Sequence, residues 1–136
     1  MPYVLRKLKM NGFLNIVVTN QPDIGNGLVD KEEVKKMHSY LLQMGLIRKI
    51  YMCPHKQIDN CECRKPRTGM FMRAKKELNV DFKRSWMIGD RFTDIQAAQS
   101  IGMLSVFIDR GYNESTGKIK DCYIVKNIMS CLEIIL

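Results

Sequence analysis

The feature that most restricts this sequence is a short stretch rich in metal-binding side chains. The segment Cys53-Pro54-His55 is followed, after five residues, by Cys61-Glu62-Cys63. Three thiolates and one imidazole can complete a tetrahedral shell around zinc, with no position open for a reacting water. We therefore predict a structural zinc site made by Cys53, His55, Cys61 and Cys63. Iron, or unrelated cysteines beside a surface histidine, are the alternatives, and the histidine favours zinc.

Around this stretch, short apolar segments alternate with amphipathic ones. The expected strands are 13–18, 47–52, 85–88, 104–108 and 123–125, and the expected helices are 3–11, 30–43, 69–78, 93–101 and 127–136. Most of the strands are continuous apolar runs, which is typical of parallel strands buried on both faces. The pattern predicts an α/β fold, a Rossmann-like three-layer sandwich with a parallel sheet, as a single domain over residues 1–136.

Composition excludes several classes of function. The formal net charge is +8, but the lysines and arginines are spread along the chain and form no nucleic-acid-binding module. No apolar run reaches the roughly 18 residues of a membrane span, and no signal peptide is recognisable. We expect a cytoplasmic protein that binds neither nucleic acid nor membrane, with its cysteines reduced.

Polar clusters follow several of the expected strands. They are Thr19-Asn20-Gln21, the Cys-Pro-His segment and Gly89-Asp90. Ligands of parallel α/β sheets bind beyond the carboxyl ends of the strands, so these clusters are candidate site residues. Asp90 and Asp94 could serve Mg²⁺, which prefers oxygen ligands. Alone, this pair is better explained as a turn residue and a helix cap, and Arg64-Lys65 as a solvated pair of charges.

Together, however, the motifs resemble a known family. Val-Val-Thr-Asn-Gln, Cys-Pro-His followed by Cys-x-Cys-Arg-Lys-Pro, and Met-Ile-Gly-Asp-x-x-x-Asp occur in this order. They are similar to the zinc-loop branch of the haloacid dehalogenase superfamily, the D-glycero-D-manno-heptose 1,7-bisphosphate and histidinol-phosphate phosphatases. The resemblance runs from about Leu5 to Asn113. It implies Mg²⁺-dependent hydrolysis of a phosphorylated small molecule through an aspartyl-phosphate.

The resemblance also implies a role for each matching residue. Thr19 and Lys65 would be catalytic, because they would contact the phosphoryl group being transferred and balance its charge. The substrate would be bound by Asn20, Gln21, Arg64 and Arg91. Mg²⁺ would be held by Asp90, with Asp94 beside it, and the zinc by the four residues of the predicted cluster.

One part of the family pattern is not found in this sequence. The nucleophile and the general acid-base of the family lie in an Asp-x-Asp-Gly motif on a first strand, and this chain has no such motif. We therefore expect an N-terminally incomplete chain that is inactive as given, from a partial or misassigned reading frame or a decayed gene. The first strand would lie at the centre of the sheet, between the strand ending at Thr19 and the one ending at Asp90.

The substrate stays open between two candidates. The loop after Thr19 and the segment Ile108–Asn113 look like those of sugar-bisphosphate phosphatases, which we favour. The five-residue gap between His55 and Cys61 looks like that of histidinol-phosphate phosphatases. A third reading is a catalytically inactive, zinc-stabilised module for phosphate binding or interaction. Oligomeric state cannot be read from the sequence.

Overall fold

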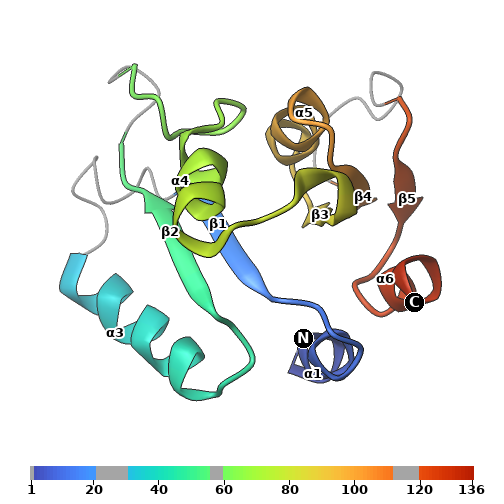
Figure 1. The fold of residues 1–136 in the computed structure, drawn as a ribbon, viewed down its shortest axis with the longest axis horizontal. Helices are drawn as coiled ribbons and strands as arrows, with labels where there is room; N and C mark the ends of the chain where they lie inside the picture. Colours follow the sequence, from blue (N-terminus) through green and yellow to red (C-terminus); the bar gives the residue numbers. More distant parts are fainter. Residues whose placement is uncertain (1, 21–30, 56–59, 112–119) are drawn as a thin grey trace.

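The computed structural model describes residues 2–20, 31–55, 60–111 and 120–136, and all secondary structure reported below lies within them. Helices and strands alternate along the chain (Figure 1). In order, they are α1 (Pro2–Met10), β1 (Ile16–Asn20), α3 (Lys31–Gln43), β2 (Lys49–Cys53), α4 (Gly69–Leu78), the 3-10 helix η2 (Phe82–Arg84), β3 (Trp86–Gly89), α5 (Phe92–Ser100), β4 (Leu104–Ile108), β5 (Tyr123–Val125) and α6 (Ser130–Ile135).

Local sequence sets many of these boundaries. The α4 helix ends at Asn79, whose left-handed backbone (φ 55°) directs its N–H to the carbonyl of Lys75. Such a conformation is tolerated by asparagine and stops a helix. The bounds of α4, β4 and β5 agree with the sequence prediction. By contrast, β1 and β2 begin at Ile16 and Lys49, later than predicted. Apolar residues in a sequence indicate which positions are buried, but they do not indicate where hydrogen bonding between two strands begins.

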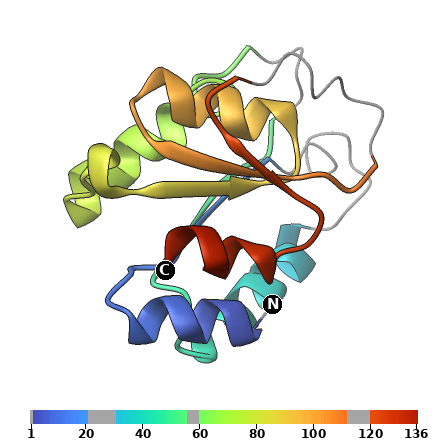
Figure 2. The same cartoon turned by 90° about the vertical axis from the view of Figure 1, so that its right-hand side faces the viewer.

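The described strands are all parallel, and helices cover both faces. Figure 2 shows α4 and α5 on one side of the strands and α1, α3 and α6 on the other. The predicted three-layer α/β fold is thereby confirmed. None of the helices in the described part of the chain has the length and hydrophobicity needed to span a bilayer.

The hydrophobic core is divided into three clusters. One packs the α4 and α5 helices against β3 and includes Phe71, Met87 and Ala98. A second lies between α4 and β2 and is centred on Tyr51 and Met70. The third cluster packs residues of β4 against α6. Val18 on β1 packs against both the first and the second cluster. The apolar packing is therefore continuous between the half of the molecule that contains β1 and β2 and the half that contains β3, β4 and β5.

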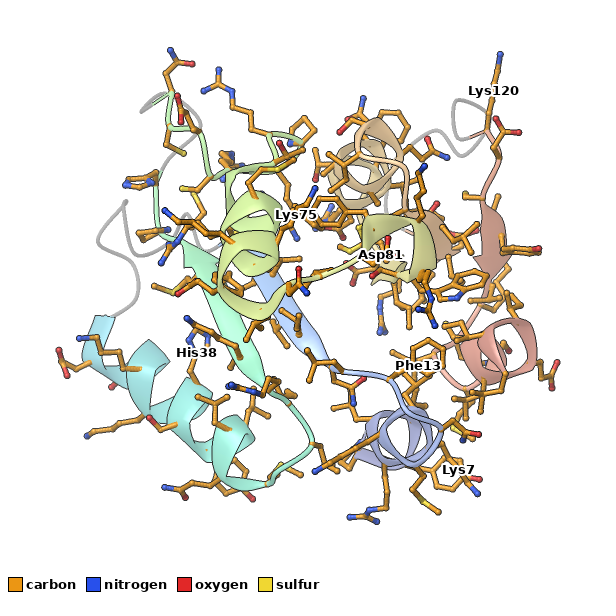
Figure 3. All side chains as sticks on the ribbon, viewed as in Figure 1. Lys7, Phe13, His38, Lys75, Asp81 and Lys120 are labelled. Carbon is orange, nitrogen blue, oxygen red and sulfur yellow. The ribbon has the colours of Figure 1, made fainter. Side chains whose placement is uncertain are left out.

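The hydrogen-bonded sheet itself is not continuous. The described strands form two sheets, β1-β2 and β3-β4-β5, on the two sides of the position where the family resemblance places its first strand. A cavity of about 680 Å³ is lined by residues of β1 and of β3, together with residues of α1 and α4. Phe13 and Asp81, labelled in Figure 3, also line it. Two strand edges that face an apolar space are unusual, because backbone donors and acceptors are normally paired or hydrated.

The first prediction concerns the core beside this cavity. Replacing Phe71, which is 4% exposed, by alanine should lower the free energy of unfolding by about 3–5 kcal/mol, because a buried aromatic ring is lost. Met72 is the matched control on the same helix. It is 43% exposed, and Met72→Ala should change the free energy by less than about 0.5 kcal/mol. Urea denaturation measures both, and equal effects would contradict the packing described.

Candidate active site

The polar side chains identified from the sequence gather at the carboxyl ends of the strands. Thr19 and Asn20 end β1, and the parallel register places Asn20 beside Cys53, the last residue of β2. Asp90 directly follows β3. Figure 1 shows β1 and β2 running side by side towards the end of the molecule that carries the loop before α4. Gln21 lies outside the described residues, so its predicted contact with substrate has no structural description here.

The predicted zinc ligands converge in that loop. The ligand atoms of Cys53, His55, Cys61 and Cys63 lie within 4.8 Å of one another. The thiol sulfurs of Cys53 and Cys63 are 2.9 Å apart, and Cys53 Sγ lies 3.6 Å from His55 Nδ1. A tetrahedron of ligands about 2.3 Å from zinc has edges of about 3.8 Å, so the group is slightly tighter than a zinc shell. The donor set and its convergence fit a closed zinc site.

Two of these thiols have strongly shifted acidities without a metal. Burial, and a hydrogen bond with Cys63, raise the pKa of Cys53 to about 12. Partial burial opposes ionisation of Cys61, but hydrogen bonds from the Cys53 thiol and the Arg64 backbone outweigh it and lower the pKa of Cys61 to about 6. Cys61 is therefore the thiol that first offers a thiolate at neutral pH. A metal must displace protons from the others, so its affinity should weaken as pH falls.

The loop that carries the cluster is also supported by contacts that the sequence pattern did not indicate. The Arg67 guanidinium donates to the carbonyl of Cys61 and to Asn60 Oδ1. The Gly69 N–H donates to the carbonyl of Glu62 at 3.0 Å. A Cβ atom at Gly69 would lie 2.6 Å from that carbonyl oxygen, so the close approach requires glycine. Arg67 and Gly69 thus hold the loop against the start of α4.

Lys65, two residues after the last thiol, lies at the centre of the site. Its side chain is 8% exposed, and its ammonium group forms an ion pair with Asp94 Oδ1 on α5. The same nitrogen donates to the carbonyl of Val18 on β1 at 2.9 Å. Because a buried ammonium needs compensating partners, both contacts are required by its burial. The lysine therefore connects β1 with the half of the molecule that contains α5.

Asn20 determines where the backbone of Lys65 lies. Its Oδ1 accepts the Lys65 N–H at 3.1 Å, and its Nδ2 donates to the Lys65 carbonyl at 3.5 Å. The sequence suggested only a substrate contact for Asn20, and that role stays a prediction. The positioning of Lys65 could not be foreseen, because the two residues are far apart in the chain.

Asp94 is equally constrained. It is 5% exposed, and its Oδ2 accepts the Arg91 N–H at 3.2 Å while Oδ1 pairs with Lys65. A Cβ atom at Gly89 would lie 2.5 Å from Asp94 Oδ2, so the glycine before Asp90 makes room for this carboxylate. Both carboxylate oxygens of Asp94 therefore already have partners, the Lys65 ammonium group and the Arg91 N–H. Its direct ligation of Mg²⁺ remains a prediction.

The other candidates surround this centre. Asp90 is half-buried, and its carboxylate pairs with Arg110, a residue that the sequence did not single out. Arg64 has a buried nitrogen, Nη1, with no hydrogen-bond partner among the described residues. The Thr19 hydroxyl donates to the carbonyl of Asn20 at 3.4 Å. An accessible carboxylate after β3 fits the oxygen preference of Mg²⁺, and an unsatisfied guanidinium fits an anion.

Comparison with known proteins gives consistent matches. The family model described as HAD-hydrolase-like, for haloacid dehalogenase, matches residues 62–128. The chain is 33% identical over 111 residues to the D-glycero-beta-D-manno-heptose-1,7-bisphosphate 7-phosphatase of Haemophilus ducreyi, covering 73% of this chain and 61% of that protein. It is 40% identical over 113 residues to a histidine biosynthesis bifunctional protein of Blochmanniella floridana, covering 77% of this chain and 32% of that protein.

A solved structure agrees with these matches. The crystal structure of D,D-heptose 1,7-bisphosphate phosphatase from B. bronchiseptica, complexed with magnesium and phosphate, superimposes with a TM-score of 0.84 at 27% identity. The match covers 98% of this chain and 79% of that one. The chain spans about one third to three fifths of the length of the two curated relatives above.

We predict that the thiol cluster binds metal and that single thiols are essential for it. Cys61→Ser should reduce bound zinc from about one ion per chain to a small fraction, because a three-ligand shell is left. Cys122→Ser removes a thiol outside the cluster and should leave zinc bound. Elemental analysis of the purified proteins measures this. Absence of zinc from the unmodified chain, or its retention in Cys61→Ser, contradicts the site.

A second prediction tests the buried ion pair. Lys65→Met leaves the Asp94 carboxylate buried without its partner and should lower the free energy of unfolding by about 3–5 kcal/mol. Adding Asp94→Asn removes the stranded charge, so the double variant should be more stable than Lys65→Met alone. Urea denaturation of the full double-mutant cycle gives the coupling energy. Simple additivity of the two single effects would show that the pair does not interact.

Proposed function

The chain belongs to the haloacid dehalogenase superfamily, in the group of the heptose-bisphosphate phosphatases and histidine biosynthesis proteins, and from this premise we propose that it carries most of the active site of a Mg²⁺-dependent phosphatase. The observation that carries the proposal is the position of Lys65, whose ammonium group contacts the Val18 carbonyl on β1 and the Asp94 carboxylate in the first turn of α5. A buried cation at the carboxyl ends of parallel strands suits a phosphoryl group.

In this proposal each candidate has one task. The Thr19 hydroxyl donates to an oxygen of the phosphoryl group, and Lys65 balances the charge that develops on it. Asp90 holds Mg²⁺, which when bound neutralises phosphate charge and orients it for in-line attack. Asp94 keeps Lys65 in place. Arg64, with Asn20, Gln21 and Arg91, faces the remainder of the substrate, and zinc held by the four-residue cluster fixes the loop that carries Arg64 and Lys65.

The nucleophile is proposed to lie on a strand between β1 and β3. An aspartate at the end of that strand attacks phosphorus, the alcohol leaves with a proton from a second aspartate, and water then hydrolyses the aspartyl-phosphate. Support comes from the largely apolar cavity of about 680 Å³ that residues of β1 and β3 line, and from the parallel pairing of the strands within each of the two sheets. A strand there would pair with both edges and close the sheet.

We propose a heptose bisphosphate, or a sugar phosphate like it, as the substrate. The similarity to heptose-bisphosphate phosphatases from several organisms supports this choice, as does the basic character of the chain, with a net charge of +8. Histidinol phosphate is the second candidate, supported by the similarity to histidine biosynthesis proteins. Both are phosphorylated metabolites, and reduced thiols at the zinc site suit a cytoplasmic location.

The inactive module is a separate candidate. It is favoured by the two partners that Lys65 already has in this chain, with the Val18 carbonyl and the Asp94 carboxylate accepting from its ammonium group. In that case the chain would bind zinc and phosphate without turnover.

The test compares this chain with a version extended upstream by about 35–45 residues, roughly one strand-helix unit. We expect the extended protein to hydrolyse the heptose bisphosphate in the presence of Mg²⁺, and to be slower with histidinol phosphate. Phosphate release measures both. An Asp90→Asn variant of the extended protein is the control, and it should lose activity by about two orders of magnitude or more because the cation is lost.

The outcomes separate the candidates. Turnover by the chain as given would reject the inactive module and the need for an upstream nucleophile. No turnover by the extended protein with either substrate would reject the phosphatase proposal. Faster hydrolysis of histidinol phosphate would move the assignment to the second substrate.

A further inference from the structure

The loop after β4 brings an arginine to the carboxylate proposed to bind Mg²⁺. Arg110 Nε lies 3.1 Å from Asp90 Oδ2, and the two side chains are 48% and 37% exposed. The parallel register explains the approach, because Gly89, the last residue of β3, pairs with Phe107, one residue before the end of β4. The arginine thus lies at the rim of the site, next to the end of β3.

The residues on either side hold this arginine in place. The Asp109 N–H donates to the carbonyl of Val125 at 2.8 Å, which continues the β4-β5 pairing past the end of β4. Asp109 Oδ1 accepts the Gly111 N–H at 3.0 Å, and Asp109 Oδ2 pairs with Lys126 at 3.0 Å. The hydrogen bond from Lys126 has the larger effect and that from the Gly111 N–H the smaller, and both lower the pKa of Asp109. Asp109 therefore stays charged and keeps the turn closed. The direction of Arg110 therefore follows from the fold.

An arginine and a divalent cation cannot share this carboxylate without cost. Arg110 contacts Oδ2 of this carboxylate, so a cation bound to either oxygen would lie close to the guanidinium, and the two positive charges repel at short range. This repulsion favours release of the guanidinium when Mg²⁺ binds Asp90, which leaves a cation at the rim of the site. A guanidinium binds phosphate oxygens in a bidentate geometry, so the released side chain suits a second anionic group of the substrate.

We infer that Arg110 is a positioning and specificity residue that exchanges partners. It holds Asp90 while no cation is bound, it yields the carboxylate to Mg²⁺, and it then binds a phosphate of the substrate other than the one transferred. The inference rests on the proposed function. By linkage, Mg²⁺ strengthens binding of a bisphosphate and a bisphosphate strengthens binding of Mg²⁺. A monophosphate, which has no second phosphate, gains less from the exchange.

The experiment measures binding rather than turnover. Mg²⁺ is titrated into the full chain and its variants, and the dissociation constant is read from the amide shifts of Gly89 and Asp90 by NMR. Arg110→Gln should bind Mg²⁺ about two- to fivefold more tightly than the unmodified chain, the range expected for loss of a competing exposed ion pair. Arg110→Lys should lie between the two, because the charge remains without the planar fork.

Two controls accompany this titration. Lys126→Gln removes a nearby positive charge that pairs with Asp109 instead of Asp90, and it should change the Mg²⁺ affinity less than Arg110→Gln does. Asp90→Asn should abolish the shift of Gly89. In a second titration at saturating Mg²⁺, fructose 1,6-bisphosphate and fructose 6-phosphate serve as probes. The unmodified chain should prefer the bisphosphate, and Arg110→Gln should lose most of that preference.

The results distinguish this inference from the proposed function. If Asp90→Asn loses Mg²⁺ but Arg110→Gln binds it no more tightly than the unmodified chain, the exchange by Arg110 is wrong and the Mg²⁺ site stands. If the preference for the bisphosphate survives in Arg110→Gln, the assigned phosphate contact is wrong. If the unmodified chain and Asp90→Asn respond identically to Mg²⁺, the metal site of the proposed function is wrong and the inference falls with it.

Discussion

The arrangement of this site depends on one buried ion pair. The Lys65 ammonium group is enclosed between the Val18 carbonyl and the Asp94 carboxylate, which belong to the two halves of the molecule. No strand ladder joins those halves within the described residues, so this polar bridge acts together with the apolar packing around Val18. A buried charge without its partner is costly, and the bridge therefore specifies how the two halves meet at the site.

The thiol cluster holds the loop residues that immediately precede this lysine in the chain. Cys63 is the last ligand of the cluster, and Arg64 and Lys65 follow it directly. The described residues of this loop, 54–55 and 60–68, lie outside helices and strands, and they are held by the cluster and by the contacts of Arg67 and Gly69. Asn20 then clamps the Lys65 backbone from β1. Metal binding at the cluster would therefore couple the order of this loop to the position of Lys65.

Two further features lie at β3. Residues of β1 and β3 line the cavity, and the exposed ion pair of Asp90 and Arg110 lies at the end of β3, at the carboxylate for which we propose Mg²⁺ binding. The cavity and the exposed ion pair both depart from the close packing of the core, and such departures are common at functional sites.

The sequence by itself determined the alternation of helices and strands, the parallel α/β class and the metal-ligand set, because periodicity and ligand spacing are local properties. It also placed Thr19 and Asp90 at strand ends, since polar residues after apolar strands collect at one edge of a parallel sheet. Lys65 was indicated only by the family resemblance, and its burial corrects the reading of Arg64-Lys65 as a solvated pair of charges. The sequence could not indicate that Asn20 clamps Lys65, that Gly89 makes room for Asp94, or that Arg110 meets Asp90. Those contacts join residues that are distant in the chain or meet only through the register of β3 with β4, and only tertiary packing decides them.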